Sequence, residues 1–223
     1  MTIDLLEDLL ANGPFAEAVA ENPVAEADQL RGGEVILIVG KRGSGKTGMA
    51  FYLLEKAHSI FPKRKCYAVG IPRSVKLPKW IRKADKVEKV PNESVVLVEE
   101  AGLGTASAYR NWEHEALRHL IQLARHKALT LIFINLNTST LDINVVRQAD
   151  TLMLREPSVF QASTERPGIK KLVLQAIEEF AKLPEAERIK HAWVIHARGA
   201  EMVATPLPGF WSDKISRSYA KER

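Results

Sequence analysis

The chain has 223 residues, of which 46% are hydrophobic and 26% charged, so its apolar content suffices for one sizeable core but not for two full domains. A single cysteine, Cys66, excludes an internal disulfide framework and suits a reducing compartment. No apolar run approaches the roughly 18 residues that a membrane helix requires, and we therefore expect a cytoplasmic protein without a membrane span.

Charge is distributed unevenly along the chain, which carries a formal net charge of +5. Residues 1–30 contain seven acidic and no basic residues, so residues 31–223 carry a net charge of +12. A basic body of this kind favours a polyanionic partner, because association with a polyanion releases condensed counterions. We predict an acidic helical arm over residues 1–32, which could serve as a solvated helix, a self-masking segment or a docking peptide.

After this arm, predicted strands and helices alternate along the chain. We expect strands at 35–39, 65–71, 94–99, 129–135 and 150–154, helices at 47–60, 111–127, 170–183 and 212–222 with Ser212 as an N-cap, and a hairpin at 191–208. This order predicts an α/β fold with a mostly parallel central sheet flanked by helices. We assign residues 33–156 to the core and residues 157–223 to a helix, hairpin and helix that complete the same domain.

The segment GKRGSGKT, residues 40–47, fits the pattern G-x-x-x-x-G-K-[ST] at every constrained position and stands between a strand and a helix. Glycines let the backbone curl so that successive N–H groups point at anionic oxygens, next to the positive end of the following helix. In such a loop Lys46 would reach the β- and γ-phosphates of ATP, and the Thr47 hydroxyl would ligate Mg²⁺. The predicted nucleotide-binding residues are Gly40, Lys41, Arg42, Gly43, Ser44, Gly45, Lys46, Thr47 and Gly48.

Two adjacent carboxylates, Glu99 and Glu100, follow directly on the apolar run at 95–98. Core packing gives no reason for a pair of like charges at a strand tip, and ligands of parallel sheets bind beyond the carboxyl ends of the strands. We predict that Glu99 faces the Mg²⁺ and that Glu100 acts as the general base that orients the attacking water. An Asp is usual at the first position, and Glu99 is one methylene longer. The alternative is a pair of solvent-facing glutamates at the start of a loop.

Taken together, GKRGSGKT, SVVLVEEAG and ARHKALTLIFINLNTSTLDINVVRQADTLML resemble the FtsK–HerA superfamily of DNA-translocating ATPases over roughly residues 33–156. Among these, the compact chain is most similar to the genome-packaging ATPases of membrane-containing icosahedral viruses. The resemblance implies a P-loop NTPase fold of the RecA-like type, ATP and Mg²⁺ as cofactors, and ATP hydrolysis coupled to the translocation of double-stranded DNA. It also implies a homo-oligomeric ring inside the host cell or on the virion, with capsid or portal-vertex proteins as further partners.

The same resemblance suggests two further catalytic residues. The family commonly has a glutamine at the end of the fourth strand that senses the γ-phosphate, and here we choose Asn135 over Asn137; a structural turn amide is the alternative. An arginine from one subunit enters the next subunit's site in such rings. Arg125, in LARHK, matches the family's Ala-Arg position, and Arg147 is the other candidate. Either arginine could instead be a surface or ion-pairing residue.

Residues 63–89 hold ten basic and two acidic residues, with Trp80 among them. This composition suits contacts with DNA phosphates, although a solvated basic face would look the same. The tail at 217–223 is a weaker candidate for DNA contact.

Two other functions remain open. A P-loop kinase of a small molecule is disfavoured by the paired glutamates, which favour water as the acceptor. A phage assembly ATPase of the zonular occludens toxin type is disfavoured because those proteins usually carry a membrane helix.

Overall fold

The computed structural model of the chain describes residues 30, 32–41, 43–99, 119–135, 148–165, 167–197 and 199–220. The predictions for the arm at 1–29, and for Arg42, Glu100, Asn137 and Arg147, lie outside these residues. None of the helices that the described residues form is both long and apolar enough to cross a membrane.

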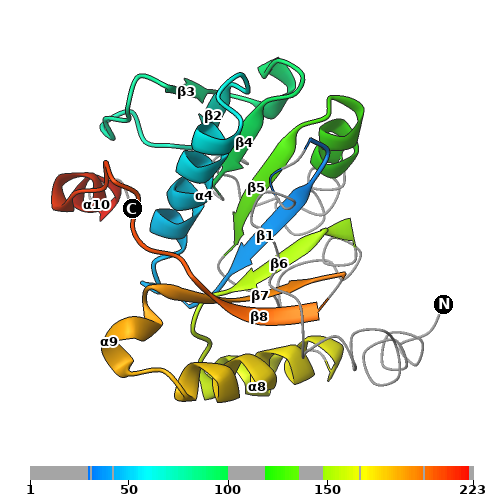
Figure 1. Ribbon diagram of the computed structural model, residues 1–223, viewed down its shortest axis with the longest axis vertical. Coiled ribbons are helices and arrows are strands. Elements are labelled where there is room, and N and C mark those ends of the chain that lie inside the picture. Colours follow the sequence, from blue (N-terminus) through cyan, green and yellow to red (C-terminus); the bar gives the residue numbers. More distant parts are fainter. Residues whose placement is uncertain are drawn as a thin grey trace.

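Eight strands form one sheet in the order β3-β2-β4-β5-β1-β6-β7-β8 (Figure 1). Their bounds are β1 Val35–Val39, β2 Cys66–Val69, β3 Ile81–Ala84, β4 Val95–Val98, β5 Thr130–Asn135, β6 Thr151–Leu154, β7 His191–His196 and β8 Gly199–Ala204. The pairs among β1 to β6 are parallel, whereas β7 runs antiparallel to both β6 and β8. The predicted α/β fold with a mostly parallel sheet, extended by a hairpin, is confirmed.

The central strand β1 is buried along its whole length. Val35, Leu37 and Val39 belong to one hydrophobic cluster, and Ile36 and Ile38 belong to a second. Successive side chains of a strand point to opposite faces of the sheet, so the two clusters are the two layers of core on either side of it. A strand covered on both faces reads as an unbroken apolar run, which is why β1 could be recognised in the sequence.

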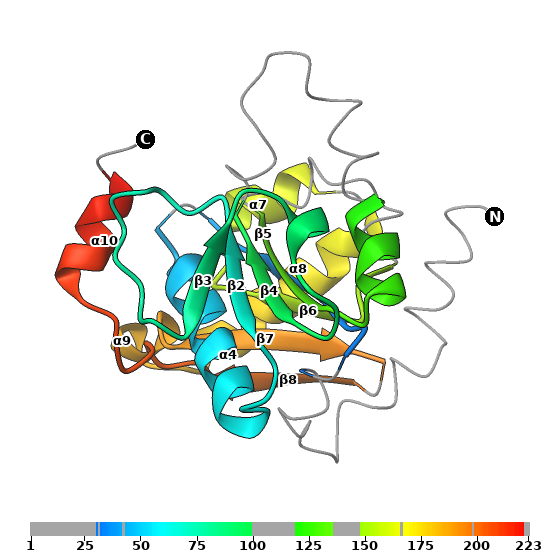
Figure 2. The ribbon, with the colours of Figure 1, turned by 90° about the horizontal axis from the view of Figure 1, so that it is seen from above.

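Helices cover both faces of the sheet (Figures 1 and 2). One face packs against α4 (Lys46–Ile60) and α10 (Asp213–Ala220), and the other against helical residues 119–126 and α8 (Pro167–Ala181). The predicted N-cap of the last helix is present, because the backbone N–H of Ile215 donates to the Ser212 hydroxyl at 3.4 Å.

Four short elements are absent from the predicted pattern, namely β3, the 3-10 helix η1 (Val87–Lys89), α7 (Val159–Thr164) and α9 (Glu185–Arg188). Strand β3 lies at the edge of the sheet and pairs only with β2, so only Ile81 of its four residues is buried. Helix α9 buries none of its residues. Elements with so little apolar burial show no hydrophobic periodicity, which is the property that sequence patterns report.

Candidate functional site

The candidate site lies at the carboxyl ends of β1, β5 and β4, which are neighbours in the sheet. The glycine-rich segment follows β1 directly, and Glu99 follows β4 directly. In the register of the sheet, Val39 of β1 pairs with Asn135 of β5, and Val98 of β4 pairs with Phe133 of β5. The backbone of Asn135 therefore lies between the start of the glycine-rich loop and the acidic strand tip.

The backbone of the loop requires glycine at three positions. Gly43 has φ 80° and Gly45 has φ 83°, values in the left-handed region that side chains with a Cβ rarely adopt. At position 40 the reason is a close approach, since a Cβ there would lie 2.7 Å from the Cβ of Arg155 and 2.9 Å from Oγ of Ser44. The glycines of the pattern are thus explained by the shape of the loop.

The loop and the start of α4 present groups that suit an anion. Gly45 caps α4 without a side-chain hydrogen bond, and the first turn of the helix contains no acidic residue. The first N–H groups of a helix have no partners within the helix and carry the positive end of its dipole. The buried Oγ of Ser44 also has no hydrogen-bond partner among the described residues. An orphaned buried hydroxyl beside the N-terminal end of a helix is what a bound phosphate would satisfy.

Lys46 is held inside the loop, with only 6% of its surface exposed. Its ammonium donates to the carbonyl of Gly40 at 2.7 Å and to the carbonyl of Lys41 at 2.8 Å. A buried ammonium needs such acceptors, because an unpaired charge in the interior is costly. These bonds place the positive charge within the loop, where phosphate oxygens could take over from the carbonyls.

Thr47 and Glu99 form a direct contact across the site. The Thr47 hydroxyl donates to Oε1 of Glu99 at 2.9 Å, and Glu99 is only 6% exposed. The backbone N–H of Glu99 donates to the carbonyl of Val69 at 3.1 Å, which extends the sheet by one residue and directs the side chain. The longer side chain of Glu99 therefore reaches Thr47 without an intervening water. A hydroxyl and a carboxylate oxygen are ligands that suit a hard cation such as Mg²⁺.

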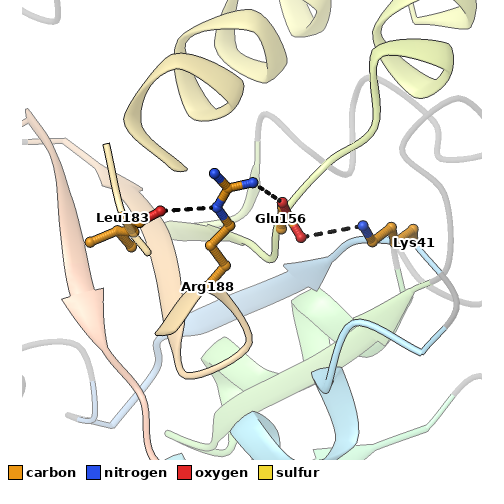
Figure 3. Close-up of polar contacts among 4 residues, drawn as sticks. All are labelled: Lys41, Glu156, Leu183 and Arg188. Atoms are coloured by element: carbon orange, nitrogen blue, oxygen red, sulfur yellow. Dashed lines mark hydrogen bonds and ion pairs between the residues drawn. The ribbon is translucent and has the colours of Figure 1, made fainter. Parts of the chain in front are cut away.

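A polar network links the loop to the short helix α9. The carboxylate of Glu156 accepts from Nζ of Lys41 at 3.3 Å and from Arg188 at 3.2 Å, and Arg188 also donates to the carbonyl of Leu183 at 3.1 Å (Figure 3). These side chains are partly exposed, so each ion pair contributes only about 0.2–1 kcal/mol to stability. The network thus connects the loop to α9 through contacts that are individually weak.

Arg125 is the predicted site residue that lies apart from the others. It is exposed at the end of helical residues 119–126. Two residues further along the chain, Lys127 donates to the carbonyls of Glu88 and Val90, which precede β4. Thr130 then pairs with Val95, so that β5 and β4 begin side by side. Arg125 therefore lies at the amino ends of these strands, whereas the phosphate loop lies at the carboxyl ends.

The predicted residues that come together are the described part of the loop, Glu99 and the backbone of Asn135. Arg155, Glu156 and Arg188 also contact the loop or its partners but are absent from the predicted site. Arg155 and Glu156 follow directly on β6. Their position at the carboxyl end of a parallel strand could have identified them.

Comparison with known proteins gives matches in fold but not in sequence. No family model matches the chain, and no curated protein matches it. The DNA-packaging ATPase B204 from Sulfolobus Turreted Icosahedral Virus has a TM-score of 0.50 and 16% identity, covering 79% of this chain and 99% of that chain. The genome packaging NTPase B204 from Sulfolobus turreted icosahedral virus 2, in complex with AMPPCP, has a TM-score of 0.51 and 15% identity over 79% of this chain and 99% of that chain.

The N-terminal domain of zonular occludens toxin from Neisseria meningitidis matches 54% of this chain and 75% of its own, with a TM-score of 0.40 and 20% identity. The similarity to the two B204 structures confirms the resemblance inferred from the sequence at the level of the fold, which is that of a P-loop NTPase.

Proposed function

We propose that the chain is an ATPase of the FtsK–HerA type that translocates double-stranded DNA, and that it serves as a viral genome-packaging motor in an oligomeric ring. The observation that carries the proposal is the hydrogen bond between Thr47 and Glu99 at the phosphate loop. A buried carboxylate beside an anion site would repel phosphate unless a cation lay between them. The arrangement therefore favours a metal–nucleotide complex over a free anion as the ligand.

Different residues of the chain would have different roles in hydrolysis. The N–H groups of the loop and the α4 terminus orient the phosphates, while Lys46 exchanges the carbonyls of Gly40 and Lys41 for phosphate oxygens. Glu100 follows Glu99 in the chain and takes a proton from the attacking water. Asn135 ends β5, and we assign it the role of sensing the terminal phosphate, because an amide can both donate and accept hydrogen bonds. Mg²⁺, when bound near Thr47 and Glu99, would neutralise charge on the phosphates.

The proteins of similar fold support the same activity. The B204 structures include a genome packaging NTPase in complex with ATP-gammaS and a DNA-packaging ATPase. Their identity to this chain is only 14–16%, so the function is inferred by combining this likeness with the residues of the site.

The direct test is ATP hydrolysis measured with and without DNA. We expect phosphate release that requires Mg²⁺ and increases several-fold with double-stranded DNA. A small-molecule kinase would transfer phosphate to an acceptor and ignore DNA, and an assembly ATPase would hydrolyse ATP at a rate that DNA does not change. Either result would exclude the DNA motor.

The basic segment at 63–89 offers a surface for DNA. Seven of its basic side chains are exposed on and around the edge strand β3, namely Arg73, Lys76, Lys79, Arg82, Lys83, Lys86 and Lys89. Trp80 is not available for stacking on bases, because its ring stacks on His58 with centroids 4.5 Å apart and meets Phe210 edge-on at 5.8 Å. The surface thus suits contacts with phosphates and not stacking of bases on Trp80.

Neutralising this surface is expected to reduce the salt dependence of DNA binding. In a variant with Lys76, Lys79, Arg82 and Lys86 changed to Gln, the slope of log K against log salt should become shallower by about 3–4, since each phosphate contact contributes about 0.9. Lys83 is retained because it donates to the carbonyls of Pro72 and Arg73. The matched control changes four exposed lysines elsewhere, Lys170, Lys171, Lys182 and Lys190. An unchanged slope would exclude the segment.

The position of Arg125 suits action on a neighbouring subunit. We expect Arg125→Ala and Lys46→Ala subunits to be inactive alone and to regain hydrolysis when mixed. In the mixture, a Lys46→Ala subunit still supplies Arg125 to the phosphate loop of a neighbouring Arg125→Ala subunit, which is intact. An arginine of this kind contributes ~10³-fold or more in rate. The same mixture made with Arg147→Ala tests the other candidate arginine. If no mixture exceeds the sum of its components, Arg125 does not act between subunits.

A further inference from the structure

Arg155 is the largest fully buried side chain among the described residues and is 1% exposed. It follows β6, and its backbone N–H donates to the carbonyl of Val39 at 2.8 Å, directly before the phosphate loop. The guanidinium donates to the carbonyls of Ile189 and His191, both at 2.7 Å, and to the carbonyl of Gly45 at 3.4 Å. Arg155 therefore joins the phosphate loop to the turn between α9 and β7.

The charge of Arg155 has no acidic partner among the described residues. All of its hydrogen bonds go to backbone carbonyls, and Nε has no partner. The neighbouring Glu156 directs its carboxylate to Lys41 and Arg188 instead (Figure 3). Burial lowers the pKa of Arg155 to about 10, so the guanidinium remains charged at neutral pH. Burying a charge without a counter-charge is costly, and an anion bound nearby would offset that cost.

Both ends of the phosphate loop contact this side chain. A Cβ at position 40 would lie 2.7 Å from the Cβ of Arg155, and a Cβ at position 45 would lie 3.7 Å from its Nη2. The Gly45 carbonyl that accepts from Arg155 belongs to the same peptide unit as the N–H of Lys46 at the start of α4. A donor at the oxygen of a peptide unit polarises its N–H and strengthens the bond that this N–H makes.

We propose that Arg155 is a positioning residue for the nucleotide phosphates. It holds the Gly45 peptide through a hydrogen bond to its carbonyl, and it supplies a buried positive charge that the bound polyphosphate compensates. The inference rests on the proposed binding of nucleotide by this loop. It assigns Arg155 a contribution that grows with the negative charge of the ligand, which a purely structural arginine would not have. The contribution also resists salt, because buried charges are screened much less than exposed ones.

The test compares ligands of different charge in Arg155→Gln. We would measure the Kd of ATP, ADP, AMP and inorganic triphosphate by calorimetry, both with and without Mg²⁺, at low and high salt; the comparison of ligand charges uses the values without Mg²⁺. We expect binding of ATP and triphosphate to weaken on the order of 30-fold and that of AMP only about 5-fold, because the Coulomb energy scales with ligand charge. Arg155→Lys, which keeps the charge but not the planar fork, should recover most of the loss for ATP.

Arg64→Gln is the matched control. Arg64 likewise donates to backbone carbonyls, those of Leu30, Glu93, Ser94 and Ala128, but at the amino ends of the strands. We expect it to lower the melting temperature without changing the ratio of the ATP and AMP affinities.

An equal loss for all four ligands in Arg155→Gln, or no loss, would overturn the inference while leaving the proposed function intact. If Arg155→Gln does not fold, Arg155→Met, a second neutral variant with an apolar side chain of similar length, decides: a loss that is equal for all ligands contradicts the charge role. Failure of the unaltered protein to bind any of the four even with Mg²⁺ present would overturn the proposed function itself, and the inference with it.

Discussion

Changing Lys46 to Ala is expected to abolish detectable ATP hydrolysis and to weaken ATP binding by about 10- to 100-fold. The ammonium is buried within the loop and bonds the carbonyls of Gly40 and Lys41, so the variant loses the charge at the point where the phosphates would bind. A hydrogen bond to a charged group contributes about 1.5–3 kcal/mol, which is about 10- to 100-fold in Kd. Phosphate release and calorimetry measure the two effects.

The control for Lys46→Ala is Lys170→Ala, which removes an exposed lysine from α8. This variant should hydrolyse and bind ATP as the unaltered protein does. Circular dichroism would show whether Lys46→Ala retains its fold. A folded Lys46→Ala protein with normal turnover would mean that the loop does not hold the reacting nucleotide.

The two adjacent glutamates are expected to give different phenotypes when each is changed to Gln. Glu100→Gln should bind ATP normally but hydrolyse it about 10²- to 10⁴-fold more slowly, as expected for loss of a general base. Glu99→Gln should require more Mg²⁺, because the carboxylate that contacts Thr47 becomes neutral. It should also bind ATP more tightly without metal, since a negative charge beside the anion site is removed.

Titrations of ATP at several Mg²⁺ concentrations separate these effects. The Gln variants are nearly isosteric, and the amide of Gln at position 99 can still accept from the Thr47 hydroxyl, so the fold should be retained. Normal turnover in Glu100→Gln would remove Glu100 from the mechanism. An unchanged Mg²⁺ requirement in Glu99→Gln would show that the Thr47–Glu99 pair does not hold the metal.

The phosphate loop could be predicted from the sequence because its chemistry is local. Gly43, Gly45, Lys46 and Thr47 are contiguous or nearly so, and their spacing alone sets which backbone conformations and side chains meet the ligand. The buried strands could be predicted equally well, since β1 and β4 are uninterrupted apolar runs. Glu99 was identified because it follows such a run, and in the structure it accepts a hydrogen bond from Thr47.

The edge strand β3 and the helix α9 could not be predicted in the same way. Their residues are mostly exposed, so the composition of these segments indicates only that they contact solvent and does not indicate a strand or a helix. The basic segment illustrates the consequence, because its charge was evident while the edge strand within it was not. The placement of Trp80 against His58 was equally hidden, since it depends on how α4 packs against the segment that leads into β3.

The sequence by itself determined the alternation of strands and helices, the glycine-rich loop and the acidic strand tip, because each depends on residues that are neighbours along the chain. The tertiary structure alone decided which distant groups support the loop. Lys41 meets Glu156 across 115 positions, and Gly45 meets Arg155 across 110. Such contacts arise from the order of strands in the sheet, where β6 lies next to β1. That order is set by the packing of the whole core, which no local pattern encodes.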